Sequence, residues 1–256
     1  MRACGILHQD KPKRKLRTAI ENTPSGQLLI ANNTPLSSAT RGQRLTFTPV
    51  EDYYTGRRDA TSGIMFGNMS TNDTEIPVAI KPHDNIASAL SEFCITQHLI
   101  SEGHIKPYQP LGFLSGRDSI YTLSAFEGDV VSCDTITDGT DIPKKIQKVL
   151  LVGAATLAML HKSGVAHGDA QIKNTAFSVK TGEERAIDLT SSYFDKSGRG
   201  IIDDMHSYID TLPDYISPTL GNKYIEEYFI DPYLSLVADA LSKKQQDSVH
   251  RVTNNL

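Results

Sequence analysis

The chain has 256 residues, of which 39% are hydrophobic and 22% are charged, and its formal net charge is −4. This composition is typical of a globular protein that buries a full core, as one large domain or as two lobes. The acidic balance disfavours nucleic acid as a partner, because nucleic-acid-binding domains carry basic surfaces. No apolar run approaches the roughly 18 residues of a membrane-spanning helix, so we expect no membrane span.

The cysteines and the first residues of the chain predict its compartment. Cys4, Cys94 and Cys133 are odd in number and widely spaced, which disfavours a disulfide framework and a zinc site. Residues 1–10 lack the apolar segment of a signal peptide. Both observations favour the reducing cytoplasm. Because Cys94 and Cys133 stand in apolar patterns, we expect both to be small core residues.

Residues 1–44 have weak periodicity and many Asn, Ser, Thr and Pro, and we expect them to form an N-terminal extension. Five basic residues fall within KPKRKLR, positions 11–17. This basic segment is either a docking arm for a protein partner or an anion, or a solvated tail. Short charged runs are common at termini, which favours the solvated tail.

Residues 45–127 predict a β-rich lobe with one helix. Apolar and polar residues alternate as in half-buried strands, and the polar segment STNDTE predicts a hairpin turn. The helix is expected at 86–100, with Asp84 or Asn85 as its N-cap. Its apolar face would carry Ile86, Leu90, Phe93, Cys94, Gln97 and Ile100. We expect the strands at 45–50, 63–69, 76–82, 110–116 and 119–128.

Residues 128–256 predict an α-helical lobe. A long helix is expected within 141–164, because Pro143 stands in its first turn and Gly164 just after its end. Its apolar positions recur every three or four residues, at Ile146, Val149, Leu150, Gly153, Leu157 and Leu160. Short apolar runs and further helices between about 201 and 246 follow, with Tyr224, Tyr228, Phe229 and Leu234 packed inward. The fold class is therefore α+β, with two lobes joined near Phe126–Gly128 and a ligand cleft at that junction.

Five polar residues stand in an order that favours phosphoryl transfer. Lys81 ends a strand in VAIK, Glu92 lies on the next helix, and Asp169 and Asn174 share the loop HGDAQIKN; Asp188 follows in AIDL. The reaction needs a cation against phosphate, oxygen ligands for Mg²⁺ and a carboxylate that takes the proton of the incoming hydroxyl. Positioning and electrostatics supply most of the acceleration.

These motifs resemble those of the protein-kinase-like superfamily over about residues 45–210. VAIK matches the strand lysine motif, HGDAQIKN matches the catalytic-loop pattern H-x-D-x-x-x-x-N, and IDL stands where D-F-G would be. The HGD form is similar to that of lipopolysaccharide-type kinases, RIO-type kinases and aminoglycoside phosphotransferases. Gly168 stands where typical eukaryotic kinases carry Arg, and Thr190 replaces the D-F-G glycine.

The resemblance implies a role for each of the five residues. Lys81 would contact the α- and β-phosphates of ATP, and Glu92 would pair with Lys81, with Glu102 as the alternative partner. Asp169 would be the catalytic base. Asn174 and Asp188 would hold Mg²⁺. The nucleotide would also be contacted by Gly56, Ser62, Gly63, Ala79 and Phe126, although the glycines are spaced more widely than in a regular phosphate-covering loop.

Two further expectations concern the support of the loop. His167 is expected to brace the loop backbone rather than to move a proton. On the helix that follows, Asp203 or Asp204 would accept hydrogen bonds from the loop backbone, or would form an exposed acidic first turn.

Three functions remain open on these residues. The first is a cytoplasmic ATP-dependent kinase for Ser or Thr of a protein, including its own chain. The second is a small-molecule hydroxyl kinase, which the HGD motif also allows; the short C-terminal half disfavours it. The third is a pseudokinase or nucleotide-binding scaffold, favoured by the irregular glycine loop and disfavoured by the presence of Lys81, Asp169, Asn174 and Asp188.

Overall fold

The structure is a computed structural model, and it divides the chain into two compact units. Unit 1 comprises Met1–Phe93 and Tyr108–Gly128, and unit 2 comprises Cys94–Pro107 and Asp129–Leu256. Across the two units the sheets are mostly antiparallel and are combined with helices, which confirms the predicted α+β class. The structure describes residues 2–3, 7–9, 27–30, 45–49, 64–70, 75–103, 108–115, 120–136, 142–212 and 222–252.

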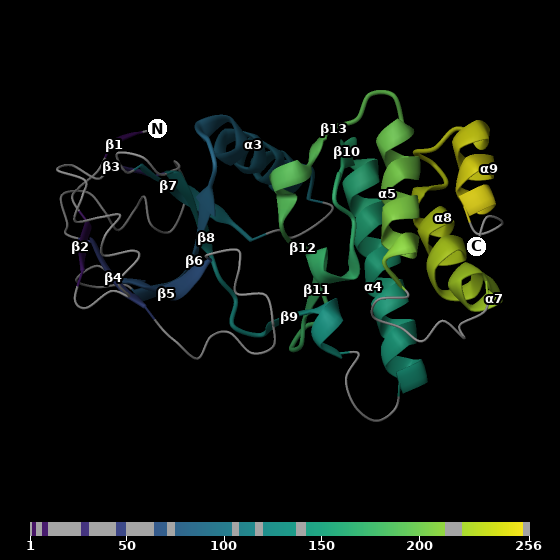
Figure 1. Ribbon diagram of the computed structural model, residues 1–256, viewed down its shortest axis with the longest axis horizontal. Coiled ribbons are helices and arrows are strands. Elements are labelled where there is room, and N and C mark those ends of the chain that lie inside the picture. The colour runs from purple at the N-terminus through teal and green to yellow at the C-terminus, as the bar shows by residue number, and fades with distance from the viewer. Residues whose placement is uncertain are drawn as a thin grey trace. The chain divides into compact units, whose positions relative to one another are not determined.

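The described residues of unit 1 form an eight-stranded sheet in the order β1-β3-β7-β8-β6-β5-β4-β2 (Figure 1). From β4 to β7 the neighbours are antiparallel, as the alternating pattern predicts. The strands are β1 (Arg2–Ala3), β2 (Leu7–Gln9), β3 (Gln27–Ile30), β4 (Leu45–Pro49), β5 (Met65–Ser70), β6 (Glu75–His83), β7 (Pro110–Ser115) and β8 (Ile120–Ala125).

Three short strands of this sheet come from the predicted N-terminal extension. β3 pairs antiparallel with β7, β1 pairs antiparallel with β3, and β2 pairs parallel with β4. Parts of residues 1–44 therefore extend the sheet at both edges. The basic segment 11–17 lies outside the described residues.

The core of unit 1 is formed by the apolar side chains of its strands, among them Phe47, Met69, Val78, Ile80, Leu111, Leu114 and Leu123. Helix α3 (Ile86–Glu102) begins directly after β6. Asn85 caps it, since its Oδ1 accepts a hydrogen bond of 2.9 Å from the Ser88 backbone N–H. Of the two predicted caps, Asn85 is thus the observed one.

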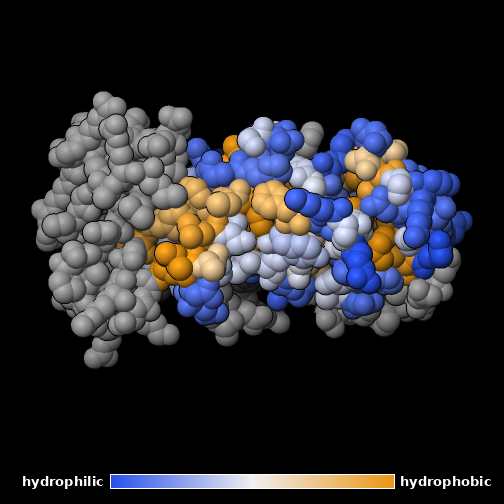
Figure 2. All heavy atoms as spheres, turned by 90° about the horizontal axis from the view of Figure 1, so that it is seen from above, coloured by the Kyte–Doolittle hydropathy of each residue, from blue (hydrophilic) through white to orange (hydrophobic). Residues whose placement is uncertain are grey.

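The predicted apolar face of α3 is wrong. Ile86, Leu90, Cys94 and Ile100 are exposed, and Figure 2 shows apolar surface along this helix. The buried side chains are instead Ala89, Ile95, Thr96 and Leu99. Apolar residues occupy both faces, so their spacing does not identify the inner one, and small residues such as Ala89 allow close packing with little hydrophobic signal. Cys94 is therefore no core residue, whereas Cys133 is fully buried as predicted.

Helix α4 (Ile142–Lys162) is the central helix of unit 2 and agrees with its predicted pattern. All six predicted apolar positions are buried, namely Ile146, Val149, Leu150, Gly153, Leu157 and Leu160. Gly164 follows its end with φ +70°, the left-handed conformation that glycine adopts without steric cost.

Short strands and further helices complete unit 2. The described strands form a three-stranded sheet, β12-β11-β9, and a two-stranded pair, β10-β13. Phe229 is buried, and Tyr224, Tyr228 and Leu234 pack against the same core, as predicted. The elements are β9 (Val130–Ser132), β10 (Val165–Ala166), β11 (Thr175–Ser178), β12 (Glu184–Ala186), β13 (Tyr193–Phe194), α5 (Arg199–Asp210), α7 (Asn222–Ile225), a π-helix (Glu226–Ile230), α8 (Asp231–Val237) and α9 (Lys243–Val252), with 3₁₀ turns at Cys133–Ile136, Ile172–Asn174 and Leu189–Ser191.

Within the part of the chain that the structure describes, no helix combines the length and apolar character needed to cross a membrane.

Gly153 gives a test of the packing between α4 and α5. A Cβ at this position would overlap the Tyr208 ring, which is fully buried and stacked on Phe229 with ring centroids 4.8 Å apart. Gly→Ala within a helix normally stabilises by up to about 1 kcal/mol. We expect Gly153→Ala instead to lower the free energy of unfolding by about 1–3 kcal/mol, measured by urea denaturation. A higher unfolding midpoint would contradict this ring placement.

Candidate functional site

Asp169 and Asn174 lie together in the 167–174 loop, which follows β10. The Asn174 Nδ2 group donates hydrogen bonds to the Asp169 Oδ2 atom, 3.0 Å away, and to the Asp169 backbone carbonyl, 2.9 Å away. The Gln171 side chain donates to the other carboxylate oxygen, Oδ1. Both oxygens of the predicted base are therefore oriented by side chains of the same loop.

Asp188 is held beside this loop by backbone pairing. Asn174 directly precedes β11, and Thr175 of β11 pairs with Ala186 of the antiparallel strand β12. The next residue, Ile187, donates its backbone N–H to the Asn174 carbonyl at 3.1 Å. One β-hairpin therefore brings the backbone at Asp188 next to that at Asn174, the two predicted magnesium ligands.

Asp188 adopts a strained backbone conformation, with φ 57° and ψ 60°. It is the one non-glycine residue with positive φ in the described ranges. Its Oδ1 atom accepts a hydrogen bond of 3.0 Å from the Thr190 hydroxyl. Such outliers concentrate at functional sites, because surrounding structure must enforce them. Asp is among the residues that tolerate this region best.

Asp204 of α5 anchors the backbone of the 167–174 loop. Its buried carboxylate accepts the backbone N–H of His167 at 2.6 Å and that of Gly168 at 2.8 Å. The His161 Nε2 atom lies 3.0 Å from the same carboxylate. Of the two predicted anchors Asp204 is the observed one, and Asp203 is exposed.

His167 braces the loop, as predicted. Its ring is fully buried, and its Nε2 atom lies 3.2 Å from the Ile187 carbonyl oxygen, to which it donates. The Ser192 hydroxyl donates to the His167 carbonyl at 3.0 Å. The imidazole therefore ties the loop to the residue that precedes Asp188.

Gly168 explains the HGD form of the motif. Its φ is +74°, and a Cβ there would overlap the Ser191 carbonyl oxygen. Any larger residue would place its Cβ against the same oxygen, so glycine is the residue that fits this backbone conformation.

In unit 1, Lys81 of β6 pairs with Glu92 of α3. The Lys81 Nζ atom lies 2.9 Å from Oε2 and 3.2 Å from Oε1 of Glu92. Both side chains are mostly buried, with 18% and 16% of their surface exposed. The predicted pairing is present, and it uses Glu92 rather than the alternative, Glu102, which is exposed.

His83 was missed by the sequence reasoning. Its ring is buried, its Nε2 atom lies 2.9 Å from the Thr122 hydroxyl, and its Nδ1 atom lies 3.2 Å from the Ser88 hydroxyl. Nε2 also approaches the Glu92 carboxylate to 3.5 Å. The signal was its position: residues 81 and 83 of one strand point to the same face.

The predicted nucleotide contacts Ala79 and Phe126 both adjoin Phe66 in unit 1. Ala79 pairs with Phe66 across β5 and β6, and the Phe126 ring lies 4.7 Å from the Phe66 ring. Tyr108 packs on Phe126 with ring centroids 5.8 Å apart. Sequence reasoning missed Phe66 and Tyr108. The other predicted contacts, Gly56, Ser62 and Gly63, lie outside the described residues.

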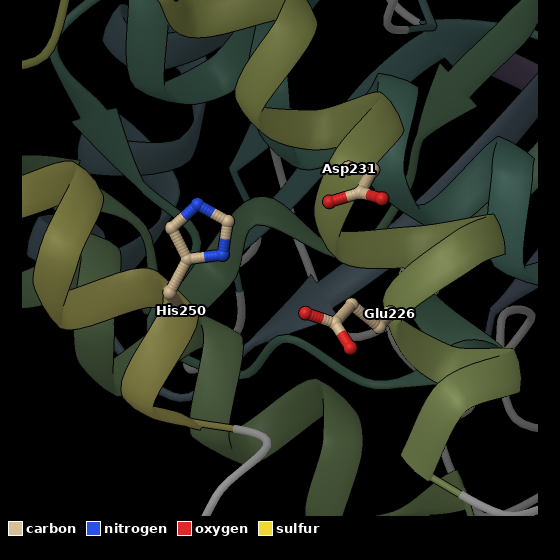
Figure 3. A group of neighbouring side chains, drawn as sticks. All are labelled: Glu226, Asp231 and His250. Atoms are coloured by element: carbon tan, nitrogen blue, oxygen red, sulfur yellow. The ribbon is translucent and has the colours of Figure 1, made fainter.

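A second group of metal-type ligands lies on the last helices of unit 2 (Figure 3). One ligand atom from each of Glu226, Asp231 and His250 falls within 4.8 Å of the others. Glu226 and Asp231 are five residues apart, and the π-helical hydrogen bond between them places both on one side. All three side chains are exposed, and exposed acidic groups commonly gather without a cation, so we assign no metal to this group.

Neither the protein-family models nor the curated proteins include a match to this chain.

The anchoring of the loop can be tested with two adjacent aspartates. Asp204→Asn would place an NH₂ group against donors that now meet a buried carboxylate, and hydrogen bonds to charged groups contribute about 1.5–3 kcal/mol each. We expect the free energy of unfolding to fall by about 2–4 kcal/mol in urea denaturation. The matched control, exposed Asp203→Asn, should change it by no more than about 0.5 kcal/mol. Equal effects of the two substitutions would contradict the anchor.

Proposed function

We propose that the chain has the two-lobed fold of the protein-kinase-like superfamily and is an ATP-dependent phosphotransferase with an alcohol acceptor. The observation that carries this proposal is the arrangement of Asp169, Asn174 and Asp188. A hydrogen bond joins the first two side chains, and a β-hairpin brings the backbone at Asp188 next to that at Asn174. Two carboxylates and an amide on one rigid support provide a base and oxygen ligands for a hard cation.

The chemistry assigns each group a step. The acceptor oxygen would form a bond to the γ-phosphorus while the bond from that phosphorus to the bridging oxygen breaks, and the hydroxyl proton would pass to the Asp169 carboxylate. Asn174 and Asp188 would hold Mg²⁺, which neutralises charge on the phosphates when bound. Gln171 and Asn174 orient the base through hydrogen bonds to its two carboxylate oxygens.

Lys81 supplies the cation for the phosphates in this proposal. Its ammonium group is held by both oxygens of Glu92, so its direction is fixed by a partner on the neighbouring helix. A cation that is already oriented and largely shielded from water stabilises phosphate charge at little reorganisation cost.

A protein Ser or Thr is the acceptor class that we propose. β13 pairs with β10, which leads directly into the 167–174 loop. The two residues of β13, Tyr193 and Phe194, are 44% and 51% exposed. Exposed aromatic residues are enriched at protein–protein interfaces, which favours a polypeptide over a small polar acceptor.

Incubation with labelled ATP and Mg²⁺, alone and with a cell extract, tests the reaction. We expect label on protein bands, and a loss of about 10²–10⁴-fold for Asp169→Asn, since general-base catalysis contributes that much. Asp203→Asn should retain full labelling. Label on small metabolites alone would instead identify a small-molecule hydroxyl kinase. Nucleotide binding without transfer would identify a pseudokinase or scaffold.

Lys81→Met and Asp188→Asn test the nucleotide and metal roles. Each should reduce turnover by at least about 100-fold, because Lys81→Met removes the cation that meets the phosphates and Asp188→Asn removes the charge of a magnesium ligand. Asn tolerates the left-handed conformation at position 188, so the melting temperature of Asp188→Asn should stay near that of the unmodified chain. Exposed Glu102→Gln is the control. Near-normal turnover of either variant would refute its assigned role.

A further inference from the structure

A chain of buried hydrogen bonds leads from the 167–174 loop to the C-terminal helices of unit 2. The Tyr233 hydroxyl of α8 lies 2.7 Å from the Nδ1 atom of His161, at the end of α4. The Nε2 atom of the same ring lies 3.0 Å from Asp204, which binds the loop backbone. All three side chains are buried.

The acceptors in this network fix the tautomer of His161. A carboxylate only accepts, so the nitrogen that faces Asp204, Nε2, must carry a proton. In the neutral imidazole the other nitrogen, Nδ1, is then an acceptor and requires a donor. The Tyr233 hydroxyl, 2.7 Å away, is the group placed to donate to Nδ1 in that state. Burial first, and then the nearby Asp204 carboxylate, raise the pKa of the Tyr233 hydroxyl, so it retains the proton that it donates.

We propose that Tyr233 is a positioning residue for the 167–174 loop, acting through the tautomer of His161 and the carboxylate of Asp204. Its relevance to catalysis rests on the proposed function, whereas its effect on the loop backbone does not. The Tyr233 ring meets the His161 ring edge-on at 5.6 Å, so packing and hydrogen bonding fix the same orientation. Asp169 directly follows Gly168. The positions in which Asp204 holds the His167 and Gly168 amides therefore set the direction in which the Asp169 side chain leaves the backbone.

Removal of the Tyr233 hydroxyl alone should disturb this network. In Tyr233→Phe the His161 Nδ1 atom would be buried without its donor, which is a costly state. The His161 ring would relieve this cost by turning, or by moving its proton from Nε2 to Nδ1. Either change removes a hydrogen-bond donor from Asp204. The His167 and Gly168 amides then lose part of their anchor.

Tyr208 provides a matched control. It is as fully buried as Tyr233, lies on α5 in the same core, and donates its hydroxyl to the Val149 backbone carbonyl at 3.2 Å. Tyr208→Phe therefore removes a buried hydroxyl without touching His161 or Asp204. A general loss of stability would affect both variants alike.

Amide hydrogen exchange of the full chain tests the effect on the loop. In Tyr233→Phe we expect exchange of the His167 and Gly168 amides to quicken by about tenfold relative to Tyr208→Phe, which is the scale of one lost hydrogen bond. Equal exchange rates in the two variants would overturn the proposal. So would a nitrogen NMR spectrum of the unmodified chain with the His161 proton on Nδ1 rather than Nε2.

Kinetics test the link to catalysis. With the labelled-ATP assay we expect Tyr233→Phe to lower kcat by about tenfold while KM for ATP changes less than about twofold, since the loop holds the base. Tyr208→Phe should leave kcat unchanged. An unchanged kcat with quickened exchange would refute the catalytic part of the proposal. Quickened exchange in a chain without any transfer activity would refute the proposed function and leave Tyr233 as a positioning residue of the loop.

Discussion

The buried carboxylate of Asp204 is the constraint on which the candidate site of unit 2 depends. A charge away from water is costly unless it is fully hydrogen-bonded, and Asp204 meets donors from the loop backbone and from His161. The two backbone donors belong to the residues directly before Asp169. The contacts that make the buried charge tolerable therefore also fix the backbone directly before the base, and the side chains of His167, Gln171 and Asn174 complete the support of the 167–174 loop.

Two unusual backbone positions show what this geometry requires. Gly168 occupies the left-handed region where a Cβ would overlap the Ser191 carbonyl, and there the chain uses glycine. Asp188 occupies the same region, yet the chain keeps a carboxylate there at a cost of about 1–2 kcal/mol. A glycine at position 188 would relieve that strain. The presence of Asp rather than Gly at this position is explained if the Asp188 carboxylate binds Mg²⁺, as proposed.

The sequence predicts what depends on local pattern and leaves open what depends on distant partners. α4 could be predicted residue by residue because its apolar positions follow one face. The inner face of α3 could not, because apolar residues occur all round it. The sequence alone does not show which of the adjacent residues Asp203 and Asp204 anchors the loop. Only the positions of the His167 and Gly168 amides distinguish them. The contact between His161 and Tyr233 spans 72 residues, and β1 to β3 are too short for periodicity.

The charged groups in both units are oriented by neighbouring side chains of the chain itself. Lys81 is paired with Glu92, and Asp169 is bonded by Gln171 and Asn174. A scaffold that only binds nucleotide needs charge complementarity, but it gains nothing from a carboxylate fixed at both oxygens. A catalyst does gain, since groups that need not reorganise stabilise the transition state more than they stabilise the substrate. The fixed direction of Asp169 is therefore the feature that favours an active phosphotransferase over a nucleotide-binding scaffold.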